Sequence, residues 1–135
     1  GDLSPFPLSL KTILFDVKNA TKRGTNLDLV LAINYGGRDD MTRAVSSIIK
    51  DVKSHKIDES DISEELITQY LDTARWPDPD LLIRTSGEQR VSNFLLWQIS
   101  YTEIVVVKTL WPDFSVSLFE EALLEYQNRT KRLGG

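Results

Sequence analysis

The chain has 135 residues, a formal net charge of −4 at pH 7 and no cysteine. This length supports one domain with a core, and the lack of cysteine excludes a disulfide framework and a thiolate metal site. The acidic balance argues against general nucleic-acid binding, which depends on clustered lysine and arginine side chains. No apolar run approaches the roughly 18 residues of a membrane span. With no secretory leader visible, we expect a cytoplasmic protein.

The first part of the chain predicts a helix, a strand and a second helix. Apolar residues recur at helical spacing between Pro7 and Gly24, which predicts the first helix. Residues 27–35 read LDLVLAINY, and an apolar middle of this kind is typical of a strand buried on both faces of a parallel sheet. After a pair of glycines, Asp39 or Asp40 is expected to cap the second helix.

Strands and helices also alternate in the rest of the chain. Residues 81–83 and 104–107 are short apolar runs that predict two more strands. Ser92 is expected to cap a helix over residues 93–100, and Ser117 to cap the last helix. The alternation predicts an α/β fold with a mostly parallel sheet flanked by helices. Three strands make a thin sheet, so we expect its other strands to lie in sequence outside these residues.

Two strand ends carry candidate binding residues, because ligands in open α/β sheets bind beyond the carboxyl ends of the strands. The first end reads NYGGR, from Asn34 to Arg38. Its glycines let the backbone approach a ligand, a helix N-terminus follows, and Arg38 adds positive charge. Taken alone, the pattern fits a plain turn with a solvated arginine slightly better than a binding site.

The second strand end, from Arg84 to Ser92, reads RTSGEQRVS and carries the stronger signal. Arg84 and Arg90 can converge across the glycine turn, and guanidinium groups bind phosphate oxygens through paired hydrogen bonds. Ser92 adds a hydroxyl at the predicted helix N-terminus, where the helix dipole favours anions. The alternative is a surface loop in which Arg84 pairs with Glu88 and Ser92 only caps the helix. The residues alone favour neither interpretation.

Glu103 is a candidate metal ligand. It lies between an aromatic helix end and a β-branched strand, where a carboxylate needs a partner. Magnesium is a reasonable partner when phosphates are nearby, and an exposed glutamate at a strand edge is the equal alternative. The predicted helix over residues 93–100 is apolar on nearly all sides, which indicates burial or contact with a partner chain.

The stretch PDLLIRTSGEQRVSNFLLWQ, residues 79–98, resembles the signature of the cis-prenyltransferases, a family that includes bacterial undecaprenyl diphosphate synthases. NYGGR, the WPDF of residues 111–114 and the closing RLGG also match in order and approximate spacing. The resemblance covers essentially the whole chain. It identifies residues 1–135 as the C-terminal portion of a single catalytic domain, and it implies an undecaprenyl diphosphate synthase-like fold without its N-terminal part.

The resemblance also implies a set of functional residues. The substrate-binding residues would be Arg84, Arg90, Val91, Ser92, Arg38, Asn34, Arg132 and Gly134. The first four would contact the diphosphate of isopentenyl diphosphate, and Glu103 would ligate the Mg²⁺ cofactor. The triplet Arg132-Leu133-Gly134 matches the RxG motif, which is expected to reach across a homodimer and help close the neighbouring active site.

The activity implied by the resemblance is the condensation of isopentenyl diphosphate with an allylic diphosphate, such as farnesyl diphosphate, to a Z-polyprenyl diphosphate. The expected product is undecaprenyl diphosphate for the cell-wall lipid carrier, and this lipid would bring the protein to the membrane surface. The family's Asp-Gly-Asn-x-Arg-type loop and its general base belong to an N-terminal half, and no such loop occurs here. We therefore expect these residues alone to be nearly inactive. Gln89 stands where some bacterial members have histidine, so we assign it no metal or proton role.

Three other interpretations stay open. The chain can belong to a non-catalytic scaffold subunit of a heteromeric cis-prenyltransferase, although such subunits tend to lose the paired arginines present here. It can be a module that senses diphosphates without turnover. It can also be a structural or dimerisation domain whose arginines are incidental.

Overall fold

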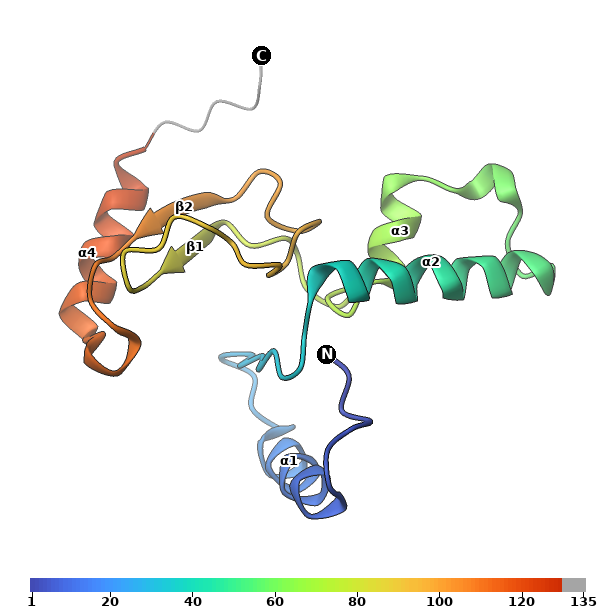
Figure 1. The fold of residues 1–135 in the computed structure, drawn as a ribbon, viewed down its shortest axis with the longest axis horizontal. Helices are drawn as coiled ribbons and strands as arrows, with labels where there is room; N and C mark the ends of the chain where they lie inside the picture. Colours follow the sequence, from blue (N-terminus) through green and yellow to red (C-terminus); the bar gives the residue numbers. More distant parts are fainter. Residues whose placement is uncertain (130–135) are drawn as a thin grey trace. The chain divides into compact units, whose positions relative to one another are not determined.

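The computed structural model describes residues 1–129, which form two compact units that divide between Gly36 and Gly37. The helices and strands are α1 (Leu8–Thr21), α2 (Gly37–Lys53), α3 (Glu64–Tyr70), β1 (Leu81–Arg84), β2 (Glu103–Val106) and α4 (Val116–Gln127), all labelled in Figure 1. Short 3₁₀ turns cover Glu59–Asp61 and Trp111–Asp113. In the part of the chain that the structure describes, no helix is both long and apolar enough to cross a membrane.

The first unit contains α1 and an irregular segment. α1 begins directly after Pro7, as the sequence predicts, with the proline in an extended conformation. Residues 27–35 do not form the predicted buried strand. No strand among residues 1–129 pairs with them, and Leu27 and Leu29 are 82% and 79% exposed. The prediction was wrong because an apolar run becomes a strand only when a neighbouring strand takes up its backbone hydrogen bonds.

Helix α2 begins three or four residues earlier than the sequence predicts. Its first residue is Gly37, so Asp39 and Asp40 lie in the first turn and not at the cap. Asp40 is only 1% exposed, and Ala44 and Ile48 follow it at four-residue intervals and are also buried. This spacing places the three side chains on one face. α2 packs against α3, which Figure 1 places alongside it.

Strands β1 and β2 pair in parallel, which confirms the predicted α/β class in a small sheet. The register places Leu81 opposite Glu103 and Arg84 opposite Val106. Glu103 therefore opens β2, one residue before the predicted start of that strand. Both strands end at the same edge of the sheet, where the second candidate site was predicted. Val105 is 1% exposed, so the middle of β2 belongs to the core.

Helix α4 packs against β2, beside the sheet in Figure 1. Its cap is Ser115, whose hydroxyl oxygen accepts a hydrogen bond from the Leu118 N–H at 3.3 Å. The predicted cap, Ser117, lies inside the first turn instead. Ala122 is the buried residue of this helix. A small side chain at that position allows the helix to approach the strand closely.

Residues 93–100 do not form the predicted helix. Ser92, Asn93 and Leu95 have φ angles of 47°, 63° and 47°, in the left-handed region that a right-handed helix cannot include. The segment forms successive turns, and its apolar side chains are half-buried. The prediction was wrong because an apolar pattern reports burial and carries no information on backbone handedness.

Arg43 joins α2 to the segment after α3 through a bidentate ion pair with Asp72. Its Nη1 and Nη2 donate to Oδ1 and Oδ2 of Asp72 at 2.8 and 2.7 Å. Its Nε also donates to Asp39, at 2.8 Å. The guanidinium lowers the pKa of Asp72 to about 2, and the two carboxylates raise the pKa of Arg43. The pair therefore ties two parts of the second unit together in a pH-dependent way.

Asp72→Asn tests this tie. Because the pKa of Asp72 falls from 3.8 to about 2 on folding, the pair stabilises the fold above pH 3.8 and is lost as the pH falls through about 2. The two side chains are partly exposed, so we expect a loss of about 1 kcal/mol in the free energy of unfolding at pH 7. The difference from wild type should shrink as the pH is lowered. Urea unfolding at several pH values measures it, with the exposed Asp78 replaced by asparagine as control. A difference independent of pH would contradict the prediction.

Candidate functional site

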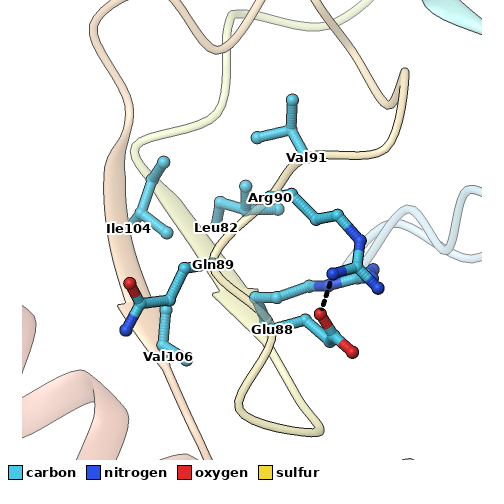
Figure 2. A pocket seen from close by; sticks show the side chains of 8 residues that line it. Leu82, Glu88, Gln89, Arg90, Val91, Ile104 and Val106 are labelled. Atoms are coloured by element: carbon cyan, nitrogen blue, oxygen red, sulfur yellow. Dashed lines mark ion pairs between the residues drawn. The ribbon is translucent and has the colours of Figure 1, made fainter.

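A pocket of about 230 Å³ lies where the loop after β1 passes the two strands. It is lined by Leu82, Arg84, Glu88, Gln89, Arg90, Val91, Ile104 and Val106, drawn as sticks in Figure 2. The pocket is smaller than the roughly 300–1,000 Å³ typical of sites for drug-sized ligands. Leu82, Arg84, Ile104 and Val106 alternate along the paired strands, so the pocket lies over one face of the sheet, under the loop that folds back after β1.

The start of the loop is fixed by backbone hydrogen bonds to the chain that follows β2. The Ser86 N–H donates to the carbonyl of Thr109 at 2.8 Å, and the Gly87 N–H donates to that of Val107 at 2.9 Å. Gly87 has a φ of 67°, a conformation that glycine adopts without steric cost. The turn therefore holds the first half of the loop against the sheet.

Two guanidinium groups and one carboxylate form the polar side of the pocket. Arg84 is half-buried, and its Nε is buried without a hydrogen-bond partner among residues 1–129. Arg90 is 68% exposed and forms an ion pair with Glu88, marked by the dashed line in Figure 2. The sequence alternative in which Arg84 pairs with Glu88 is thus not what the structure contains. The excess of positive charge and the unpaired Arg84 Nε suit an anionic ligand.

The remaining lining is apolar apart from Gln89. Leu82 of β1, Ile104 and Val106 of β2, and Val91 of the loop contribute it. Figure 2 shows Gln89 on the side of the loop that faces Ile104 and Val106, whereas Glu88 and Arg90 extend to the other side. Polar and apolar walls in one pocket match a small anion that carries a short apolar group. The fold is therefore of the α/β class, and the pocket combines a charged wall with an apolar wall.

The other predicted substrate-binding residues of the second unit do not line this pocket. Ser92 is exposed with a left-handed backbone. The Arg38 side chain is exposed, and its backbone N–H donates to the Asn93 Oδ1 at 2.9 Å. The Gly37 N–H donates to the Asn93 carbonyl at 2.7 Å. Two N–H groups at the N-terminus of α2 are therefore bonded to protein, where the sequence pattern predicted contact with a ligand.

Asn34 belongs to the first unit, where it is bonded to Asp2. Its side-chain amide donates to the Asp2 carbonyl at 2.8 Å, and its own carbonyl accepts from the Asp2 N–H at 3.1 Å. Arg132 and Gly134 lie outside the described residues. Substrate contact by these three residues stays a prediction.

Glu103 lies at the opposite end of its strand from the arginine loop. Its carboxylate accepts a hydrogen bond from Arg129 Nη1 at 2.9 Å, and Arg129 also pairs with Glu125 at 2.5 Å. These carboxylates raise the pKa of Arg129. A carboxylate has the donor chemistry that Mg²⁺ prefers. Within residues 1–129, however, no three histidine or acidic side chains gather where they could hold an ion. The described residues do not make a metal site by themselves, and Mg²⁺ ligation by Glu103 stays a prediction.

Sequence comparison gives the family of the chain. A family model described as "Putative undecaprenyl diphosphate synthase" matches residues 1–134. The isoprenyl transferase of Chlamydia caviae is 52% identical over 134 residues, which are 99% of this chain and 54% of that protein. The isoprenyl transferase of Clostridium perfringens is 48% identical over 135 residues, which are 100% of this chain and 53% of that protein. The chain belongs to the undecaprenyl diphosphate synthase family of isoprenyl transferases, and it spans about half the length of the relatives it matches.

Solved structures agree with this family. The lavandulyl diphosphate synthase of Lavandula x intermedia, crystallised with dimethylallyl diphosphate, matches with a TM-score of 0.96 and 35% identity, over 100% of this chain and 58% of its own. The structure of "a probable undecaprenyl diphosphate synthase" from Campylobacter jejuni matches with a TM-score of 0.84 and 37% identity, over 100% of this chain and 61% of its own. The fold of these residues is thus that of prenyl diphosphate synthases.

The sequence interpretation missed one contact close to the site. Asn93 binds the N-terminus of α2 from a position 55 residues further along the chain. A local signal existed, because asparagine tolerates left-handed backbone better than most residues. The local sequence does not indicate which distant residues asparagine will bind, so only the structure reveals its contact with the N-terminus of α2.

Glu88→Gln tests the charge balance of the pocket. The Glu88 carboxylate competes with an anionic ligand for Arg90 and repels that ligand, so its removal should tighten binding. Since the ion pair is partly exposed, we expect a gain of about two- to five-fold in affinity for inorganic pyrophosphate. Calorimetric titration of the complete protein measures the affinity, with Glu120→Gln on the exposed side of α4 as a matched control. Weaker pyrophosphate binding by a folded Glu88→Gln variant would count against this arrangement.

Proposed function

We propose that the protein containing these residues is a cis-prenyltransferase, and that this chain supplies the site for the diphosphate of isopentenyl diphosphate. The observation that carries the proposal is the buried, unpartnered Nε of Arg84 in a pocket that also contains Arg90. A buried donor without a partner is costly in a protein, and a diphosphate oxygen would remove that cost. Membership of the isoprenyl transferase family supports the same ligand.

The two kinds of pocket wall have separate roles in this proposal. Arg84 and Arg90 hold the diphosphate through charge-assisted hydrogen bonds. Leu82, Val91 and Ile104 contact the isopentenyl group, whose burial against apolar side chains is favourable. Because the diphosphate of isopentenyl diphosphate remains on the product, these arginines position the substrate and do not assist a leaving group.

The reaction itself follows from the two substrates. The terminal alkene carbon of isopentenyl diphosphate forms a bond to the first carbon of the allylic diphosphate. The carbon–oxygen bond of the allylic substrate breaks, and its diphosphate departs with the electron pair. A general base outside these residues then takes a proton from the isopentenyl unit, and the new Z double bond forms. Positioning dominates such a reaction, so a chain that holds only one of the two diphosphates should turn over very slowly.

Three finer features remain proposals about the complete protein. They are dependence on Mg²⁺, assembly as a homodimer with an RxG motif at Arg132–Gly134, and an undecaprenyl product made from farnesyl diphosphate. Chelation with EDTA tests the first, and sedimentation velocity the second. Chromatography of the extracted product tests the third.

Arg90→Ala tests the binding role. The variant should bind isopentenyl diphosphate more weakly by about 1.5–3 kcal/mol, the range for hydrogen bonds to charged groups, which is roughly a 10- to 150-fold loss of affinity. Calorimetric titration of the complete protein measures this change, and Arg23→Ala on an exposed part of the chain is the control. Unchanged affinity in a correctly folded Arg90→Ala protein would rule out this site.

Turnover separates an enzyme from a sensor or a scaffold. The complete protein, supplied with labelled isopentenyl diphosphate, farnesyl diphosphate and Mg²⁺, should elongate the allylic chain, and residues 1–135 alone should not. Binding without elongation by a folded protein would favour a sensor. Elongation that appears only with an added partner subunit would favour a scaffold.

A further inference from the structure

We infer that Asn93 is the positioning residue that sets the geometry of the arginine loop, residues 85–92, by fastening the end of the loop to the N-terminus of α2. The inference rests on the proposed function, since it assigns a role within the same diphosphate site. It concerns a residue outside the pocket lining, which acts through its neighbours Ser92 and Arg90. The contacts that support it lie entirely in the second unit.

The two ends of the loop are anchored to different elements. The first end is held by the backbone bonds of Ser86 and Gly87 to the chain after β2. The second end reaches α2 through Asn93, whose carbonyl accepts from the Gly37 N–H at 2.7 Å and whose Oδ1 accepts from the Arg38 N–H at 2.9 Å. Arg90, which is largely exposed, lies between these anchors. Its position therefore depends on both of them.

The backbone around Asn93 is in a conformation that needs support. Ser92, Asn93 and Leu95 all have positive φ angles, and none of them is glycine. Such conformations persist only where surrounding contacts fix them, and they cluster at functional sites. Asparagine is among the residues that tolerate this region best. The two bonds from α2 supply the fixing contacts, so Asn93 holds the adjacent Ser92 in its left-handed conformation.

Gly37 completes the anchor from the side of the helix. A Cβ atom at this position would lie 2.9 Å from both the Leu96 Cγ and the Leu96 backbone nitrogen. Only a residue without a side chain lets the segment after Asn93 approach the first turn of α2 so closely. The same contact can therefore be disturbed from either side, through Asn93 or through Gly37.

Asn93→Gly is the decisive variant, made in the complete protein. Glycine tolerates the left-handed conformation and leaves the backbone carbonyl that binds Gly37, and it removes the side chain with its Oδ1 acceptor. We expect the KM for isopentenyl diphosphate to rise about ten-fold, with little change in the KM for farnesyl diphosphate. Asn93→Asp keeps both the acceptor and the tolerance for positive φ, so it should restore most of the affinity at an ionic strength that screens the added charge. Gly37→Ala should reproduce the effect of Asn93→Gly.

The controls distinguish a positioning role from a general loss of folding. Asn19→Ala, at an exposed position of α1, should leave both KM values unchanged. A purely structural role would reduce the fraction of active enzyme, so that kcat falls and both KM values stay the same. That result, or an unchanged KM in folded Asn93→Gly, would overturn the inference.

Direct binding separates failure of this inference from failure of the proposed function. Inorganic pyrophosphate should bind the wild-type protein, and it should bind Asn93→Gly about ten-fold more weakly. Equal binding by the two proteins would overturn the role of Asn93 and leave the diphosphate site intact. Absence of binding to the wild type would overturn the diphosphate site, and with it the inference.

Discussion

The parallel pairing of β1 with β2 is the constraint on which the rest of the site depends. Because Arg84 lies opposite Val106, the strands end together, and the chain leaving each strand passes the same edge of the sheet. The loop after β1 then bonds to the chain after β2 through Ser86 and Gly87. A shift of one residue in this register would turn Arg84 to the other face of the sheet and remove it from the pocket. The guanidinium pair thus depends on strand alignment before it depends on the loop.

A polar network supports this arrangement where the apolar core is small. The buried apolar residues of the described chain are Ala44, Ile48, Leu71, Val105 and Ala122. Asp40 and Gln98 are buried among them at 1% and 2% exposure. Asp40 accepts from the Asp72 N–H at 3.0 Å, and the Gln98 side-chain amide donates to Thr73 at 2.8 Å. Such bonds are directional, so they specify how α2 and the turns after Asn93 each meet residues 72 and 73 more closely than apolar contact would.

The sequence predicted those features that local pattern controls and missed those that depend on distant partners. Helix α1 and the strands β1 and β2 follow from periodicity, whereas the strand predicted over residues 27–35 does not form. The predicted caps of α2 and α4 lie inside the first turns of these helices, because several serines and aspartates near a helix start are equally suitable acceptors. The predicted helix over residues 93–100 failed for a different reason. Its backbone handedness is fixed by contacts with Gly37 and Arg38, which are far away in the sequence.

For Glu103, the sequence indicated that the carboxylate has a positively charged partner but not which one. The sequence interpretation held that this carboxylate needs a counter-charge, and the structure provides one in Arg129, just after α4. Spacing could not choose between an arginine and a metal ion, because both satisfy the same electrostatic requirement. The position of Arg129 relative to the strand depends on tertiary structure, which no sequence motif reports.

The exposed apolar segment after α1 has a consequence for the folding and solubility of the chain. Residues 27–33 combine leucine, valine and isoleucine in a run without proline, and Leu27, Leu29 and Leu31 are largely uncovered. A run of this composition is a template for strand addition between molecules. Asp28 interrupts it with one charge, in the manner of a gatekeeper residue. When this segment is not covered, for example during synthesis, pairing with strands of the same chain competes at this segment with pairing between chains, which leads to aggregation.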